Sequence, residues 1–541
     1  MKMNLGDKEF HIAPMIDVST IEFRYFIRLL TKRAVIWNQM VVAETLVHRH
    51  RIHTQNCSKE HASYDDDADS NNSTDGNGHD VELTPDLIKH CGWYDDSHIS
   101  GINPHPTICQ IGSNIPSEAA FATNIAFKCG YDSIDLNSEC PSDRVAGRCF
   151  GAALMKDQQT SKEVVSAMLT TSQSLDKPLP VSVKTRIGVD DQEGFEFISS
   201  YIQRLVNVGC TNFIIHARKV FMEGLDPAQN RTVPPLDYPC VYRLMEHFPN
   251  CTFIHNGGIR SLVHARELAF GSTIKFDKDG NGREESNNSS DNEPIDGHVI
   301  PCQQCNLPHG SCLHPPRIAP PNMRGVMVAR LARDRPADLA DIDRYFYGES
   351  SNPCKNRREL MERYISFLER IYPRRCCDDD ETITLGMARD MPTTIVPTRP
   401  YCTVCREFRG QNGNATCEVI PPPQMNTSRK SEASISIASN KIRQQRQQSG
   451  KRAKRHDKYE GAKIVTRVID RALQPTWSIL AGTKGKRAFV NTSHELSRDK
   501  TVRNCGPAYV LWKAMKAVPD EVWDKQFELS GERKTSYYPT K

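Results

Sequence analysis

Eight short apolar runs, rich in β-branched residues, recur between residues 10 and 350, and amphipathic helical stretches separate them. Each run is almost continuously apolar, as a strand buried on both faces of a parallel sheet should be. These alternations predict a (β/α)8 TIM barrel, an α/β fold of about 250 residues before insertions. A doubly wound open sheet is the alternative, which the lack of a GxGxxG turn after the first run disfavours. The runs are residues 10–15, 34–42, 107–112, 133–137, 180–186, 212–218, 251–258 and 325–330.

Three polar segments interrupt the pattern: residues 56–80, 276–298 and about 421–461. The first two are rich in Asn, Asp and Ser and almost free of apolar residues, so they cannot offset the entropy cost of ordering. The third begins with three prolines and becomes rich in Ser, Gln and basic residues. We interpret all three as insertions.

From residue 356 onward the pattern becomes purely helical, which predicts a second domain. The sequence therefore predicts two domains rather than the three or four that its length allows. We expect a barrel at residues 10–350, with insertions at about 51–100 and 272–322, and a helical domain at residues 351–541, with an insertion at about 376–461.

Composition excludes some classes of protein. The chain has no stretch of about 18 apolar residues, and its N-terminus lacks the order of a signal peptide, so we expect neither a membrane nor a secreted protein. The 19 cysteines are spread along 541 residues, which favours reduced thiols, metal ligands or a catalytic thiol over a disulfide framework. We therefore expect a reducing compartment, the cytoplasm, with the nucleus or an organelle as alternatives. The net charge of +4 is too mild to indicate nucleic-acid binding by itself.

Polar residues gather at the carboxyl ends of the predicted strands, where a (β/α)8 barrel carries its active site. The glycine pair after the seventh strand and Ala329–Arg330 after the eighth suit the binding of a phosphate. Lys184 would set a positive charge beside an electron-rich ring such as a flavin. For any single residue, a hydrogen-bonded core group is an equal alternative. The strand-end residues are Gln110, Asn137, Cys140, Lys184, Arg186, His216, Arg218, Asn256, Gly257 and Gly258.

Cys140 is the predicted proton donor of this site. An ordinary thiol, with a pKa of about 8.5, is mostly protonated at neutral pH and can act as a general acid. Cys149 in the same loop is the rival, and a small buried hydrophobe is the structural alternative for either.

The chain resembles the tRNA-dihydrouridine synthases, of the A type, over about residues 10–350 less the two insertions. The resemblance rests on several long motifs in the same order, and a fainter similarity extends into the C-terminal helices. The motifs are APMIDVSTIEFRYFIRLL, QIG, SIDLNSECPSDRVAGRCFGAALM, PVSVKTRIGVDD, FIIHARK, QNRTVPPLDYPCVYRL, NGGI and GVMVAR.

The resemblance implies a barrel-bound FMN, reduced by NADPH, that passes a hydride to carbon 6 of a flipped-out uracil while a cysteine protonates carbon 5. Cys140 would be that cysteine, and Asn137 would lie beside the base. Arg231 would meet tRNA, as would Arg487, in a segment similar to one that lies against tRNA in the family. The residues that would hold FMN are Pro14, Met15, Gln110, Lys184, His216, Asn256, Gly257, Gly258, Ala329 and Arg330.

Three residues depart from the family pattern. Glu139 and Ala329 stand where the family usually has glycine, and Gln39 stands where the A type has glutamate. These departures motivate an alternative function, a catalytically weak tRNA-binding flavoprotein that acts as an RNA chaperone. A flavoenzyme that reduces free pyrimidines is a third reading, which the helical domain argues against.

Two further patterns lie in or near the insertions. Residues 441–455 carry seven basic residues and no acid, which suits contact with RNA phosphates, nuclear import or a solvated linker. Two cysteine clusters, Cys302/Cys305/His309/Cys312 and Cys402/Cys405/Cys417, are only loosely compatible with zinc, so no metal is predicted. We expect a monomer, and which uridine is reduced stays open, although the A-type resemblance points to the D-loop.

Overall fold

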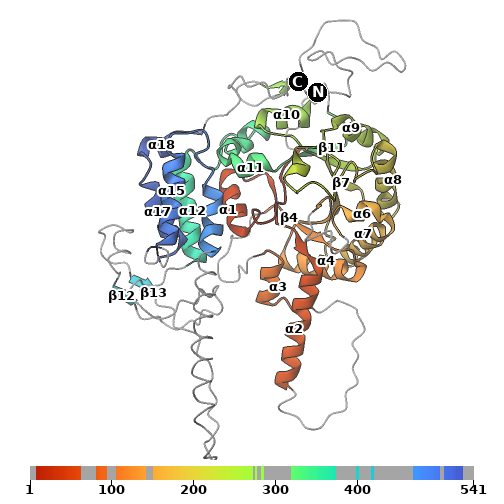
Figure 1. Cartoon of the computed structure of the whole chain (residues 1–541), viewed down its shortest axis with the longest axis horizontal. Helices are drawn as coiled ribbons and strands as arrows, with labels where there is room; N and C mark the ends of the chain where they lie inside the picture. The colour runs from red at the N-terminus through yellow and green to blue at the C-terminus, as the bar shows by residue number, and fades with distance from the viewer. Residues whose placement is uncertain are drawn as a thin grey trace, which may run out of the picture. The chain divides into compact units, whose positions relative to one another are not determined.

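The computed structural model describes residues 8–61, 81–93, 105–141, 150–271, 274–276, 282–284, 319–372, 398–400, 416–418, 467–499, 502 and 505–527. These residues form two compact units (Figure 1). The barrel unit runs to Lys355 and also includes Phe527, whose backbone amide donates to the Lys355 carbonyl at 3.2 Å. The helical unit runs from Asn356 to Gln526, so the boundary lies just beyond the predicted residue 350.

The barrel unit is a closed parallel barrel surrounded by helices, which confirms the predicted fold (Figure 1). β1 pairs with both β2 and β11, and β2 also pairs with β4, so the ring of strands closes. β2 and β3 share the second of the eight strand positions, because both pair with β4. The strands are β1 (Glu9–Ile12), β2 (Val35–Trp37), β3 (Val41–Val42), β4 (Thr107–Gly112), β5 (Ser133–Ser138), β6 (Val181–Arg186), β7 (Asn212–His216), β8 (Thr252–Asn256) and β11 (Met323–Val328).

The helices between the strands begin and end at the residue types that favour helix ends. Asp237 accepts the Cys240 amide at the start of α9, and Ser261 does the same for His264 at the start of α10. α4 starts at Pro116 and ends at Cys129, where Gly130 caps it in a left-handed conformation. The helices are α1 (Ile21–Leu30), α2 (Ala43–His61), α3 (Pro85–His90), α4 (Pro116–Cys129), α6 (Ala153–Lys156), α7 (Gln158–Gln173), α8 (Phe195–Val206), η2 (Gln229–Arg231), α9 (Tyr238–His247), α10 (Leu262–Phe270), α11 (Arg330–Asp334), η3 (Pro336–Leu339) and η4 (Ile342–Phe346).

The structure describes residues 51–61 and 81–93 of the insertion predicted at 51–100. α2 continues to His61, and α3 begins at Pro85 after a cap by Thr84. Trp93 packs on Tyr131 with ring centroids 4.2 Å apart, so this stretch is anchored to the barrel. Within the described parts of the chain, no helix, α2 included, is both long and apolar enough to cross a membrane.

The other two predicted insertions also contain some regular structure. β9 (Ile274–Phe276) and β10 (Gly282–Glu284) form an antiparallel pair within 272–322, and β12 (Thr398–Pro400) and β13 (Thr416–Glu418) form another within 376–461. The polar run 62–80, the basic run 441–455, and the possible zinc ligands Cys302, Cys305, His309, Cys312, Cys402 and Cys405 lie outside the described residues.

An apolar cluster fills the inside of the barrel below the ends of its strands. Its members come from six different strand positions, which only the barrel interior brings together. Ile214 and Ile254 each lie two residues before a predicted site residue, so His216 and Asn256 project from the same inner face. The cluster therefore supports a polar layer at the carboxyl ends of the strands. It comprises Ala13, Val35, Trp37, Ile108, Ile214, Ile254 and Met327.

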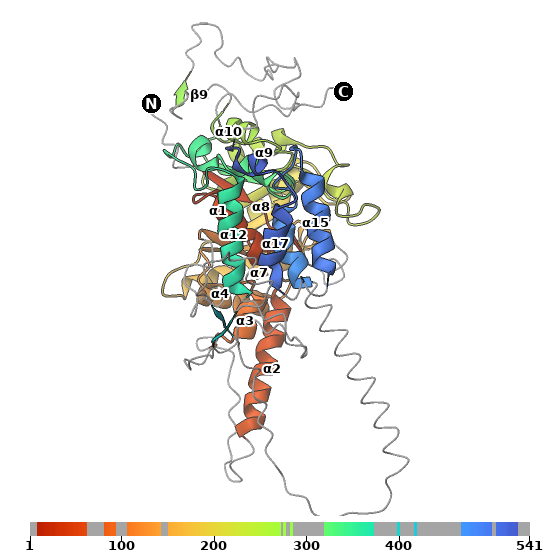
Figure 2. The same cartoon turned by 90° about the vertical axis from the view of Figure 1, so that its left-hand side faces the viewer.

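The described residues of the helical unit are mostly helical, and α12, α15 and α17 run side by side (Figures 1 and 2). Asn356 caps α12 by accepting the Glu359 amide at 2.9 Å. Arg358 joins α12 to α18 through ion pairs with Asp520, at 2.7 Å, and Asp524. The helices are α12 (Arg357–Ile371), η5 (Gln474–Thr476), α15 (Lys486–Arg498), α17 (Gly506–Met515) and α18 (Asp520–Asp524), and residues 467–473 are also helical.

Candidate active site

Strand register brings the predicted residues of β4 to β8 together at one end of the barrel. Asn137 of β5 pairs with Lys184 of β6, and His216 of β7 lies between Arg186 and Asn256 of its two neighbours. Asn256 also donates to the Met327 carbonyl of β11 at 2.8 Å, which continues the row to the last strand. The site is thus built on rigid strands.

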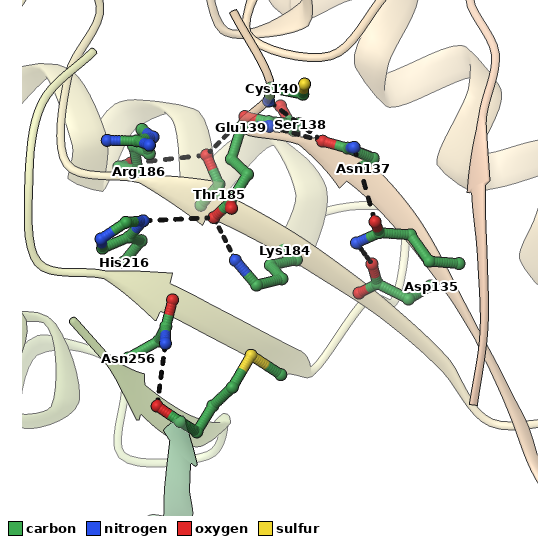
Figure 3. Close-up of polar contacts among 12 residues, drawn as sticks. Asp135, Asn137, Ser138, Glu139, Cys140, Lys184, Thr185, Arg186, His216 and Asn256 are labelled. Atoms are coloured by element: carbon green, nitrogen blue, oxygen red, sulfur yellow. Dashed lines mark hydrogen bonds and ion pairs between the residues drawn. The ribbon is translucent and has the colours of Figure 1, made fainter. Parts of the chain in front are cut away.

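The end of β5 holds the predicted proton donor (Figure 3). The side-chain oxygen of Asn137 accepts the backbone amides of Glu139 at 2.9 Å and of Cys140 at 3.2 Å. This arrangement fixes the chain as it leaves the strand and sets Cys140, which is partly exposed, at the barrel mouth. Cys149, its rival in the sequence, lies outside the described residues.

Glu139 turns its carboxylate back into the barrel mouth (Figure 3). The ammonium of Lys184, a side chain only 2% exposed, forms an ion pair with Glu139 Oε2. Burial raises the pKa of Glu139, but Lys184, His216 and Arg186 outweigh burial and hold that pKa well below its ordinary value. The carboxylate is therefore ionised at neutral pH, and it lies against the lysine predicted to face the flavin.

His216 stands on the other side of the same carboxylate. Its Nδ1 lies 3.7 Å from Glu139 Oε2, too long for a hydrogen bond. Burial and the charge of Arg186 lower the pKa of His216 to about 3, although Glu139 opposes them, so the ring is neutral. His216 Nδ1 has no hydrogen-bond partner among the described residues.

Asp135 lies inside the barrel and supports the side-chain amides of Gln110 and Asn137. Gln110 Nε2 and Ser182 Oγ each donate to its carboxylate at 2.9 Å. Asn137 Nδ2 lies 3.5 Å from Gln110 Oε1, which links Asp135 to Asn137 in one chain of contacts (Figure 3). Burial raises the pKa of Asp135 well above its ordinary value, against the hydrogen bonds from Gln110 and Ser182.

Five arginines, Arg186, Arg218, Arg231, Arg260 and Arg330, lie close enough for their charges to interact. Burial, together with Arg330 and Arg186, lowers the pKa of Arg218 to about 10, and burial with Arg260 and Arg231 lowers that of Arg330. Arg330 Nη2 is 3.5 Å from the Arg231 carbonyl. The Nε atoms of Arg186 and Arg218 have no hydrogen-bond partner within the described part of the chain. Mutually repelling cations with unused donors form an environment that favours an anion.

The turn after β8 requires two glycines. Gly257 and Gly258 have φ angles of +121° and +71°, which side chains rarely adopt. A Cβ on Gly258 would overlap Leu236 and lie 3.0 Å from the Tyr238 hydroxyl. The glycines therefore keep the backbone open beside His216.

The departures at Ala329 and Gln39 are accommodated without strain. Ala329 has a φ of −119°, and its methyl group packs against the apolar cluster. Gln39 Oε1 accepts the Asp17 amide at 3.1 Å and so fixes the turn that follows Pro14 and Met15.

The remaining predicted residues are less closely gathered. Pro14 and Met15 follow β1 at the same end of the barrel, and Met15 donates its amide to Ser19 Oγ at 3.0 Å. Arg231 lies in η2 beside Arg330. Arg487 is exposed in the first turn of α15, in the helical unit.

Three groups that shape the site have no predicted role in the sequence. The sequence places Asp135 in a buried strand and assigns it no role. It lies two residues before Asn137, so the two side chains share the inward face of the strand. Arg260 follows the glycine turn, and no motif singles it out. Glu139 stands out only as a departure from glycine, and its sequence position gives no sign that it contacts Lys184.

Comparisons with known proteins agree with this architecture. The family model described as "Dihydrouridine synthase (Dus)" matches residues 90–273. The tRNA-dihydrouridine(20/20a) synthase of Vibrio vulnificus is 30% identical over 359 residues, which span 66% of this chain and 79% of the relative. The protein of the same name from Shewanella oneidensis is 35% identical over 363 residues, or 67% of this chain and 78% of the relative. That of Escherichia coli K12 is 35% identical over 258 residues, or 48% and 61%.

Proposed function

Because the chain belongs to the dihydrouridine synthase family, we propose that it reduces uridines of tRNA to 5,6-dihydrouridine, using FMN that is reduced by NADPH. The names of the relatives specify positions 20 and 20a, and we propose these D-loop uridines as its substrates. We expect it to act as a monomer in the cytoplasm.

The described residues fit a flavin mononucleotide. The neutral His216 ring, whose Nδ1 has no hydrogen-bond partner among the described residues, suits the polar edge of a flavin ring, as do the Gln110 amide and the Lys184 ammonium. The turn at Gly257 and Gly258 leaves room for close backbone approach, and the arginines around Arg330 suit the phosphate. Pro14, Met15, Asn256 and Ala329 complete the proposed FMN set.

FMN, when bound, would supply the hydride that adds to carbon 6 of the uracil ring. The chain supplies the proton: Cys140 Sγ donates it to carbon 5, so that one hydride and one proton saturate the double bond. Asn137 holds the backbone of Cys140 and lies where it can contact the base. Lys184 holds positive charge deep in the mouth, where reduction accumulates negative charge.

The observation that carries this proposal is that Asn137, which pairs with Lys184 in the strand register, accepts the backbone amide of Cys140 at 3.2 Å. The test is to incubate the purified protein with FMN, NADPH and unmodified tRNA, and to measure dihydrouridine by mass spectrometry of the digested nucleosides. Formation of dihydrouridine in tRNA but not from free uracil is expected. Failure to form it with FMN bound and NADPH oxidised would contradict the proposed substrate.

We further propose that tRNA contacts both units through arginines. Arg231 lies next to the barrel mouth, and the exposed Arg487 in α15 follows Lys484 and Lys486. A phosphate contact by either would strengthen tRNA binding, and rising salt concentration would weaken that contribution. Replacement of Arg487 by alanine should therefore raise the KM for tRNA and leave FMN binding unchanged.

A catalytically weak flavoprotein that acts as an RNA chaperone is the second candidate. The ion pair between Glu139 and Lys184 favours it, because it occupies the cation on which flavin chemistry would depend. Promotion of tRNA refolding without dihydrouridine formation, unaffected by Cys140→Ala, would support this candidate over the enzyme.

A further inference from the structure

Glu139 lies at the centre of the charged groups at the barrel mouth. Its backbone amide is held by Asn137 Oδ1 at 2.9 Å, and its carboxylate pairs with Lys184 and lies 3.7 Å from His216. Lys184 and His216 are side chains that the proposed function assigns to the flavin ring. The carboxylate therefore occupies Lys184 and lies near His216, two groups that FMN would need.

The charges around Glu139 explain why its side chain turns inward. Lys184 and Arg186 of β6 attract it, and His216 of β7 faces it as a neutral ring. Asp135 of β5 is the neighbouring acid, and burial raises its pKa well above the ordinary value. The cationic side of this balance dominates. The Glu139 carboxylate therefore serves as the counter-ion of these cations at the mouth of the barrel.

We propose that Glu139 is an internal competitor of the flavin ring for Lys184 and His216, and that it sets how weakly this chain retains FMN. The inference rests on the proposed function, since it assumes that FMN is the cofactor. It concerns a residue of this chain rather than the flavin site in general, because Glu139 stands where the family usually has glycine.

Two features make the competition direct. A lysine ammonium that pairs with a carboxylate cannot give its full charge to the ring, and an anion left beside the ring opposes the negative charge of reduction. The Glu139 side chain is 21% exposed, so it has access to solvent when it leaves Lys184, while Asn137 continues to hold its backbone. Loading of FMN thus requires the carboxylate to give up its cation.

The test is the dissociation constant of FMN, measured by quenching of flavin fluorescence on titration of the flavin-free protein. The variants are Glu139→Gln, which keeps the shape and removes the charge, and Glu139→Gly. Glu193→Gln is the matched control, since Glu193 is a half-exposed acid that pairs with Lys219 at 2.6 Å in the loop after β6. Circular dichroism melts verify that each variant folds.

We expect Glu139→Gln to bind FMN about tenfold more tightly than the wild type, and Glu193→Gln to bind as the wild type does. A gain of more than about threefold supports the inference; a smaller gain, or weaker binding, overturns it and leaves the proposed function intact. If Glu139→Gln does not fold, the same threshold applies to Glu139→Gly. If no variant and no wild-type protein binds FMN, the cofactor of the proposed function is wrong, and the inference is wrong with it.

Discussion

The side-chain oxygen of Asn137 accepts the backbone amide of Cys140 at 3.2 Å, so one amide group both borders the barrel mouth and positions the thiol. A small displacement of a reacting group costs about 100-fold in rate. We therefore expect Asn137→Ala to lower kcat for dihydrouridine formation about 100-fold in a protein that still folds. Asn207→Ala removes an exposed amide on the outer side of the barrel and should leave kcat unchanged. Equal kcat values for the two variants would contradict the role of Asn137.

Cys140→Ala should lower the rate of dihydrouridine formation about 100-fold or more, because it removes the general acid. FMN binding should be retained, since the thiol is not assigned to the cofactor. Cys240→Ala is the control: this α9 thiol is buried, and burial raises its pKa to about 12. Single-turnover oxidation of the reduced flavin by tRNA measures the step, and an unchanged rate in Cys140→Ala would refute the assignment.

Arg330→Ala should raise the Kd for FMN about tenfold or more, because it removes one of the cations that face the proposed phosphate. Arg333→Ala on the same short helix is the comparison, since Arg333 already pairs with Asp334 at 2.6 Å. Both variants should bind riboflavin, which has no phosphate, with the same Kd as the wild type. A loss of riboflavin binding in Arg330→Ala would show that this arginine acts on the ring instead.

Gly258→Ala should lower the free energy of unfolding more than Gly224→Ala does. Both glycines have left-handed φ angles, +71° and +80°, so each substitution costs about 1–2 kcal/mol from the backbone. Only at Gly258 does a Cβ also overlap Leu236, whereas nothing lies within 4 Å at Gly224. We expect an additional loss of about 1–3 kcal/mol in the free energy of unfolding for Gly258→Ala, measured in urea. Equal losses would mean that the turn relaxes around the methyl group.

Asp135 predicts a specific dependence of stability on pH. Burial raises the pKa of Asp135 in the folded chain above the unfolded value of about 3.9, despite the hydrogen bonds from Gln110 and Ser182. Its contribution to stability is therefore complete below about pH 4 and is lost as pH rises through the folded pKa.

Asp135→Asn keeps a neutral side chain of the same shape at every pH. The melting temperature of the wild type should consequently fall relative to that of Asp135→Asn as pH rises from about 4 to 8. Asp176→Asn, at an exposed position, should follow the wild type over this range. A difference that stays constant or grows in the opposite direction would contradict the protonated state of Asp135.

The barrel could be predicted from the sequence because each strand is short, apolar and separated by a helix with recognisable ends, as Pro116 and Gly130 show for α4. The second run is the exception, since residues 34–42 form two strands, β2 and β3, in place of one. Asn38 separates them by turning its side chain to accept the Gln110 amide at 2.7 Å. Apolar character alone does not reveal such a break.

The site is predictable to the extent that strand ends converge. Lys184, His216 and Asn256 do so because strand register fixes their positions. The direction of the Glu139 side chain depends on charges contributed by two other strands, which no local pattern encodes. Asp135 shows the same limit, because a nearly continuous apolar run does not say which of its residues face inward.

The pairing of β1 with β11 has a consequence for how the protein is made. Glu9 lies beside Gly325, and a Cβ at residue 325 would collide with the Glu9 backbone, so only glycine lets the two strands meet. One edge of β1 pairs with β11, which lies more than 300 residues later in the chain. During synthesis its unpaired edge stays exposed until residue 328 has left the ribosome, a period in which chaperones would be expected to hold the nascent chain.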